Sequence, residues 1–103
     1  MDLGKLLHIT GFQWDQGNLE KNWFKHGVSP LECEEVFFNQ PLLISMDSAH
    51  SQNEARYLAL GKTNQGRELA VVFTLRQDQT LIRVISARAQ HRKERLIYDQ
   101  VRT

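Results

Sequence analysis

The sequence predicts a single α+β domain: two helices, an antiparallel sheet of about four strands with a short extra strand before the helices, and a closing helix. Two observations support this. The hydrophobic spacing changes from a helical period to strand-like runs near residue 41, and the later runs are joined by connections of a few residues. A chain of 103 residues with 41% hydrophobic content is sufficient for one small core.

The first elements are a short strand and a helix. Residues 11–14 alternate apolar and polar side chains, as a strand does. Asp15 is expected to cap the N-terminus of the helix, and Gly27 to cap its C-terminus. Trp14 and Trp23 are expected to anchor this region in the core rather than to stack on bases.

The second helix has clear boundary residues. Ser29 suits the N-cap, Pro30 suits the first helical position, and Glu32 at the third position completes a capping box. Val36 is expected on the buried side, and Pro41 is expected to end the helix.

The remaining apolar runs are predicted strands. Short polar turns separate them, which favours an antiparallel meander. The expected strands cover residues 41–47, 56–63, 68–76 and 80–87.

The closing segment "SARAQHRKERLIYDQ", residues 86–100, is predicted to be helical and is unusually basic. At helical spacing one face holds His91, Arg95, Tyr98 and Arg102, which would form a basic stripe with an exposed tyrosine. Arginine suits bidentate phosphate contacts, and tyrosine can stack on a base.

The other side of this helix is apolar and is expected to pack on the sheet; it comprises Ala89, Leu96, Ile97 and Val101. Arg88 and Arg92 would extend the basic side. The alternative is an ordinary solvated face that includes a pair between an arginine and Glu94.

Charge is distributed unevenly although the net charge is only +1. Residues 1–55 hold three Lys/Arg against eight Asp/Glu, a net of −5, whereas residues 56–103 hold ten against four, a net of +6. Such asymmetry suggests a surface for a polyanion, unless the charges mix again in the folded chain.

Arg83 interrupts an apolar strand, on the face expected to hold Leu81, Ile85 and Ala87. A buried arginine needs a partner, so either this face is open to solvent or a carboxylate such as Glu68 or Asp47 meets Arg83. Arg67 and Arg76, at the ends of the preceding strand, could join an open basic face.

A basic face of this kind would permit RNA cleavage by the 2′-hydroxyl, which needs a base, an acid and positive charge at the phosphate. The candidate acids and bases are His26, His50, His91 and Tyr98. His26 could instead serve only the helix terminus, and His50 could be an ordinary loop residue.

No metal site is expected, because the histidines are scattered and the only cysteine is Cys33. That single cysteine suits a reducing, cytoplasmic setting. Apolar runs of about five residues are too short for a membrane helix, which needs roughly 20.

Several motifs in order resemble the BrnT family of ribonuclease toxins, over about residues 12–99. The family pattern has an aromatic–x–W–D opening, N-x-x-K-H-G-V-S, D-x-x-H-S-x-x-E-x-R, G-R, and I-R-x-I-S-A-R-x-A followed by E-R-x-x-Y. The matching residues are Phe12, Trp14, Asp15, Asn22, Lys25, His26, Gly27, Val28, Ser29, Asp47, His50, Ser51, Glu54, Arg56, Gly66, Arg67, Ile82, Arg83, Ile85, Ser86, Ala87, Arg88, Glu94, Arg95 and Tyr98. Gln90 stands where the family commonly has a small residue.

The resemblance implies the toxin of a bacterial type II toxin–antitoxin pair, with a RelE-like fold. Such a toxin would cleave RNA with neither metal nor cofactor and stop translation. A BrnA-like antitoxin with a ribbon-helix-helix part would neutralise it, and the complex would bind operator DNA through the antitoxin. No membrane role is implied. Residues 12–103 would form the toxin domain, preceded by an extension at 1–11.

The resemblance also implies roles for residues. Arg67, Arg83 and Arg88 would bind the phosphate, with His26, Lys25 and Tyr98 as proton-transfer groups. From the basic pattern of the sequence, further RNA contacts are expected from Arg76, His91, Arg92, Arg95, Arg102, His50 and Arg56. Two other readings stay open: a noncatalytic module that binds RNA or an antitoxin, and a degenerate toxin that no longer cleaves.

Overall fold

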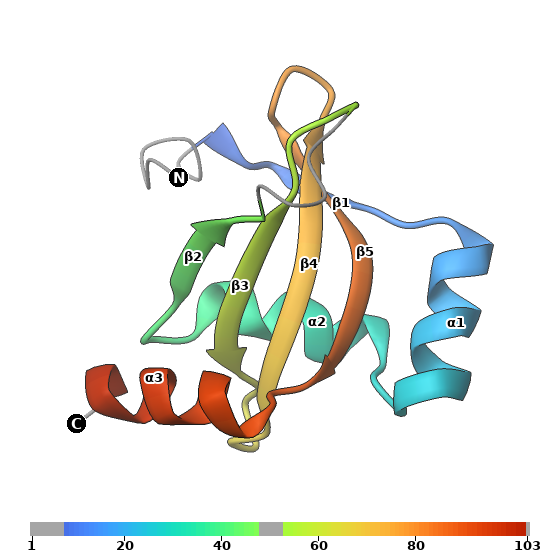
Figure 1. Ribbon diagram of the computed structural model, residues 1–103. Helices are drawn as coiled ribbons and strands as arrows, with labels where there is room; N and C mark the ends of the chain where they lie inside the picture. The colour runs from blue at the N-terminus through green and yellow to red at the C-terminus, as the bar shows by residue number, and fades with distance from the viewer. Residues whose placement is uncertain (1–7, 48–52, 103) are drawn as a thin grey trace.

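The computed structural model describes residues 8–47 and 53–102, and it confirms the predicted order of elements (Figure 1). The elements are β1 (Gly11–Gln13), α1 (Gln16–His26), α2 (Pro30–Phe38), β2 (Leu43–Met46), β3 (Tyr57–Lys62), β4 (Glu68–Arg76), β5 (Leu81–Ala89) and α3 (Arg92–Arg102).

The five strands form one sheet in the order β1-β5-β4-β3-β2. Strands β2 to β5 pair antiparallel with their sequence neighbours, which confirms the predicted meander. Strand β1 pairs parallel with β5, so the segment before the helices forms the edge strand of the sheet opposite β2.

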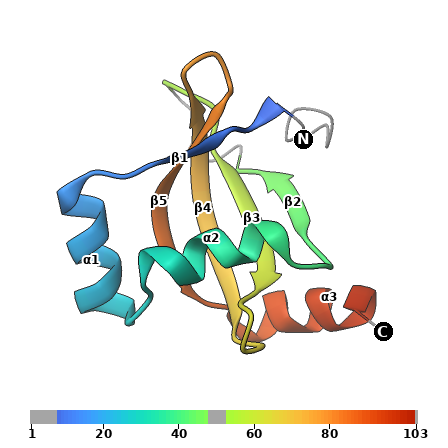
Figure 2. The same cartoon turned by 180° about the vertical axis from the view of Figure 1, so that it is seen from behind.

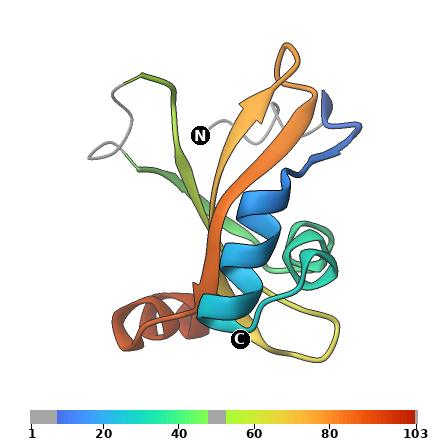
Figure 3. The ribbon, with the colours of Figure 1, turned by 90° about the vertical axis from the view of Figure 1, so that its right-hand side faces the viewer.

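The two faces of the sheet differ in how they are covered. Helix α2 crosses one face and supplies the main core there, where Val36 packs with residues such as Val71 and Phe73 (Figure 2). Helix α3 lies on the opposite face, as the side view shows (Figure 3), and forms a small second cluster with Leu60 and Ala70. The sheet therefore has one fully covered face and one partly covered face.

A β-bulge in β5 decides which side chains reach the partly covered face. Val72 pairs with Ser86 and Phe73 pairs with Val84, so Ile85 has no residue opposite it. The extra residue reverses the alternation of side chains beyond it. Ala87 is consequently buried in the main core, and the expectation that it shares a face with Arg83 is wrong.

Helix α3 is rotated relative to the sequence expectation. It begins at Arg92, because Ser86 to Ala89 continue β5. Tyr98, expected on an exposed stripe, is fully buried, and its hydroxyl donates to the carbonyl oxygen of Pro41 at 2.7 Å.

The side of α3 expected to pack on the sheet faces solvent instead: Leu96, Ile97 and Val101 are 56%, 55% and 49% exposed. The ring of Tyr98 fills the space against the sheet, and its hydroxyl is hydrogen-bonded. Burial of this ring with its hydroxyl bonded is favoured over burial of the aliphatic side chains on the other side of the helix.

Helix α1 lies along the edge of β5 beyond the end of β1. The Asn18 side chain donates to the carbonyl of Val84, and the Asn22 side-chain oxygen accepts from the amide of Ala87. These asparagines satisfy backbone groups that a neighbouring strand would otherwise satisfy. Trp14 packs against the core as predicted, but Trp23 is 56% exposed, so its expected anchoring role is wrong.

Both predicted helix starts are confirmed. The Asp15 side chain accepts from the Asn18 amide at 2.8 Å, and Ser29 forms a capping box with Glu32. Gly27 ends α1 with a φ of 63°, a left-handed conformation that favours glycine. No helix among residues 8–47 and 53–102 has the length and apolar character to span a bilayer.

Gly61 on β3 allows α2 to approach the sheet. A Cβ atom placed there would lie 2.7 Å from a methyl carbon of Val36 and 3.2 Å from its carbonyl oxygen.

We expect Gly61→Ala to lower the free energy of unfolding by about 1–3 kcal/mol through overpacking, measured by urea denaturation. Gly17→Ala is the control, because that Cβ meets only ordinary contact at 3.4 Å and helix propensity favours alanine by up to about 1 kcal/mol. Equal effects at both sites would contradict this reading of the α2–β3 contact.

Candidate functional site

The partly covered face of the sheet brings together Arg83, Ser86 and Arg88 of β5 with Thr74 of β4. Arg83 pairs with Thr74, and Arg88 pairs with Ala70, whose side chain lies in the small cluster under α3. The bulge at Ile85 is what places the two arginines on one face despite a separation of five residues. We call this surface, formed by Thr74, Arg83, Ser86 and Arg88, the arginine face.

The end of the 47–56 loop borders the arginine face. The Thr74 hydroxyl donates to the carbonyl oxygen of Ala55 at 2.7 Å. Arg76, at the end of β4, forms an ion pair with Glu54 at 3.0 Å. The loop motif is thus tied to the sheet beside Arg83, although His50 itself lies outside the described residues.

Arg83 is held by the segment that leads into α1. Its guanidinium pairs with the Asp15 carboxylate and donates to the Gln13 side chain at 3.2 Å. Of the two possibilities left open for Arg83, pairing with a carboxylate is therefore found, and the carboxylate is Asp15, which caps α1, where Glu68 and Asp47 were the examples named.

Arg88 is held at the start of α3. It forms two hydrogen bonds with Glu94, at 2.7 and 3.1 Å. Glu94 also accepts from the backbone amide of His91 at 2.8 Å, and so caps the helix. The pair between an arginine and Glu94, which the sequence analysis considered, is therefore present.

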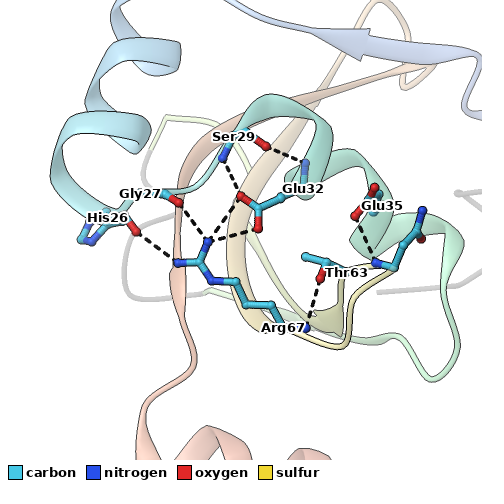
Figure 4. Close-up of polar contacts among 8 residues, drawn as sticks. His26, Gly27, Ser29, Glu32, Glu35, Thr63 and Arg67 are labelled. Carbon is cyan, nitrogen blue, oxygen red and sulfur yellow. Dashed lines mark hydrogen bonds and ion pairs between the residues drawn. The ribbon is translucent and has the colours of Figure 1, made fainter.

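Arg67 lies apart from the arginine face, with its guanidinium at the junction between α1 and α2 (Figure 4). Its guanidinium bonds Glu32 of α2 at 3.1 Å and the carbonyl oxygens of Gly27 and His26 at 2.9 and 3.2 Å. Helix α2 covers the opposite face of the sheet, so Arg67 does not join Arg83 and Arg88. The expected convergence of all three arginines is not found, because Arg67 fastens the junction between α1 and α2.

The carboxylates of these pairs are held in their charged form. Hydrogen bonding from the Asn18 amide, with the Arg83 charge beside it, lowers the pKa of Asp15. Burial alone would raise the pKa of Glu32 and of Glu94. At Glu32, hydrogen bonds from the Ser29 amide and from Arg67 outweigh this effect of burial, so the pKa of Glu32 is lowered. At Glu94, hydrogen bonds from Arg88 and from the His91 amide outweigh it, so the pKa of Glu94 is lowered as well.

The predicted proton-transfer groups are dispersed. Lys25 and His26 are exposed at the end of α1, where His26 presents its backbone carbonyl to Arg67 while its imidazole points away (Figure 4). His91 is exposed at the start of α3. Tyr98 is buried, so the structure does not place its hydroxyl where RNA could reach it.

Other candidate residues divide between two regions. Arg56 follows the loop and makes its own interactions, and its carbonyl accepts from the Asp47 amide at 2.8 Å. Arg92, Arg95 and Arg102 belong to α3, where Arg95 bonds the Gln90 carbonyl at 3.3 Å.

Neither a metal site nor a reactive thiol is found in the described part of the chain. No group of three His, Cys, Asp or Glu side chains there could hold an ion. Burial raises the pKa of the Cys33 thiol to about 12, which makes it a poor nucleophile.

Comparison with known proteins identifies the family. A family model described as the ribonuclease toxin BrnT of type II toxin–antitoxin systems matches residues 14–94. The chain belongs to the BrnT family. No curated protein sequence matches it. The crystal structure of the Brucella abortus ribonuclease toxin BrnT has a similar fold, with a TM-score of 0.61 at 24% identity, covering 81% of this chain and 99% of that one.

In this BrnT-family chain three of the motifs identified in the sequence lie at helix boundaries: the W-D opening, N-x-x-K-H-G-V-S and E-R-x-x-Y. The three carboxylates that pair with arginines at helix starts were missed as a set, yet each has a local signal. Asp15 stands at an N-cap, and Glu32 and Glu94 stand at the third position of their helices. What the sequence could not indicate is which arginine each carboxylate would meet.

We expect these carboxylates to make stability fall in acid. Because the folded-state pKa of Glu94 lies below its ordinary value of 4.5, its contribution is present above about pH 4.5 and is lost as pH falls through the folded pKa. Glu94→Gln should lower the free energy of unfolding at pH 7 by about 1 kcal/mol, allowing for solvent screening, and should lose less stability between pH 5 and 3.

Urea denaturation at each pH measures both effects. Glu20→Gln is the charge-matched control, since the side-chain donor to Glu20 is the neutral Gln16 rather than an arginine. An acid loss in Glu94→Gln as steep as in the wild type would contradict the role assigned to the Arg88–Glu94 pair.

Proposed function

We propose that this BrnT-family protein is a cytoplasmic, metal-independent endoribonuclease toxin that inhibits translation by cutting RNA on its arginine face. The observation that carries the proposal is the bulge at Ile85, which brings Arg83 and Arg88 to one face beside the loop that ends at Ala55. Family membership supplies the class of activity, and the arginine face supplies a place for a phosphate.

The ion pairs do not prevent these arginines from binding phosphate. A guanidinium has five N–H donors. Arg83 directs one bond to Gln13 and one to Asp15, which leaves donors for a ligand. The Arg83 side chain is 23% exposed and that of Arg88 is 27% exposed, so an RNA backbone can reach both. The carboxylates would orient the guanidinium planes before RNA arrives.

The proposed reaction is attack of the 2′-hydroxyl on the adjacent phosphate. A base removes the hydroxyl proton, an acid returns a proton to the departing 5′-oxygen, and the arginines stabilise the charge that develops on the phosphate. We retain His50 as a proton-transfer candidate, because Ala55, a later residue of the same motif, accepts a hydrogen bond from Thr74. His26 and Lys25 lie at the end of α1 near Arg67, and we do not assign them to the arginine face.

We propose a cognate antitoxin as the second partner. A BrnA-like protein with a ribbon-helix-helix part would neutralise the toxin, and the complex would bind operator DNA through the antitoxin. Membership of a type II toxin–antitoxin family supports the existence of such a partner.

The alternative function is a noncatalytic module that binds RNA or an antitoxin. It is favoured by one observation: Arg67, Arg83 and Arg88 each pair with a carboxylate. Growth arrest on expression in bacteria, relieved by the antitoxin, separates the two, because a noncatalytic module would bind without stopping growth.

The arginine face predicts a specific pattern of RNA cleavage. With EDTA present, Arg83→Ala and Arg88→Ala should each slow cleavage by about 100-fold or more, the usual result of removing one donor to a developing negative charge. Cleavage is followed on gels with purified RNA, using protein shown to be folded by circular dichroism.

Arg67→Ala is the matched control. It also removes an arginine from a carboxylate that caps a helix, but on the side of α2. We expect it to lower stability while the folded protein cleaves within a few-fold of the wild type. Loss of cleavage in Arg67→Ala with normal cleavage in the other two variants would move the site to the α1–α2 junction.

A further inference from the structure

The outer side of α3 carries two parallel rows of side chains at i, i+4 spacing, and each row starts with a cation. One row is Arg92, Leu96 and Gln100; the other is Lys93, Ile97 and Val101. The three aliphatic side chains are each about half exposed, within six residues of one helix. We call these six residues the outer α3 surface.

Polar contacts on the opposite side of the helix fix this exposure. Tyr98 is buried with its hydroxyl bonded to Pro41, and Arg95 bonds the carbonyl of Gln90. Glu94 is bound by Arg88. The helix therefore cannot turn its aliphatic side to the sheet without breaking all of these bonds, so the fold holds an apolar surface in water.

Within the described part of the chain, the cations on this surface form no ion pair with an acidic residue. No carboxylate among residues 8–47 and 53–102 pairs with Arg92 or Lys93, in contrast to Arg67, Arg76, Arg83 and Arg88, which each pair with one. An occupant with carboxylates at one end and apolar side chains along its length would complement both rows.

We propose that the outer α3 surface is the docking site for an amphipathic, acidic segment of the antitoxin, an inference that rests on the proposed function. Aliphatic side chains favour a protein over RNA, because they offer no ring face on which a base can stack. A second copy of this chain fits less well, because a two-fold contact would place this surface against its own copy, whose six residues include two cations and no carboxylate. A helix laid along the rows would place its anchors at i, i+4 spacing.

The test uses Leu96→Asp and Ile97→Asp, with Leu31→Asp as the matched control because Leu31 is 65% exposed on α2. The probe is the purified product of the reading frame that adjoins the toxin gene, titrated by calorimetry. We expect each α3 variant to bind at least about 30-fold more weakly, as for an interface hot spot, and Leu31→Asp to bind as the wild type does.

Two further measurements keep the test independent of folding and of activity. In the wild-type complex the amides of α3 should exchange hydrogen more slowly than in the free protein. In cells, Ile97→Asp should still arrest growth but should no longer be rescued by the antitoxin. If the wild type never arrests growth, the proposed function fails, and the titration still decides the docking surface.

Several results would overturn the proposal. These are unchanged affinity in both α3 variants, equal loss in Leu31→Asp, no binding of the probe to the wild type, or no protection of α3 in the complex. A change from dimer to monomer in the variants, with antitoxin affinity unchanged, would assign the surface to a second copy. Loss of RNA affinity alone would assign it to the substrate.

Discussion

Each of the three helices has, at its N-cap or in its first turn, a carboxylate that pairs with an arginine from the sheet or its turns. The carboxylate accepts a backbone amide at the helix start and pairs with a guanidinium at the same time. The three pairs are Asp15 with Arg83, Glu32 with Arg67, and Glu94 with Arg88. Because exposed ion pairs contribute little by themselves, the importance of these pairs lies in joining a helix start to a strand. They set where each helix lies relative to the sheet.

These pairs also explain why a nearly neutral protein has a basic second half. Acidic residues of the first half meet arginines of the second half in space, as Asp15 and Arg83 do, so much of the charge asymmetry along the sequence disappears in the fold. Positive charge remains available to a ligand on two small areas of the surface. Arg83 and Arg88 keep unused donors on one face, and on the outside of α3 Arg92 and Lys93 form no ion pair with any acidic residue that the structure describes. A phosphate and an acidic protein segment would therefore meet different cations.

The parts of the fold that depend on local chemistry were predictable from the sequence. Asp15, Gly27 and the capping box at Ser29 mark helix boundaries through contacts within a few residues, and all are confirmed. The face of β5 was not predictable, because the bulge at Ile85 arises from pairing with β4 and leaves no distinct mark in the sequence. The rotation of α3 was also missed. Its amphipathic pattern was evident, but burial of Tyr98 depends on the distant carbonyl of Pro41.

Helix α3 connects the two proposed sites. Its inward side holds Glu94, which orients Arg88 on the arginine face, and its outward side holds Leu96 and Ile97. A segment docked on the outward side would not by itself cover Arg83, because the helix lies between that side and the sheet. Neutralisation through the outer α3 surface therefore requires one of two things. Either the antitoxin extends from α3 across the arginine face, or docking shifts α3 enough to change how Glu94 holds Arg88.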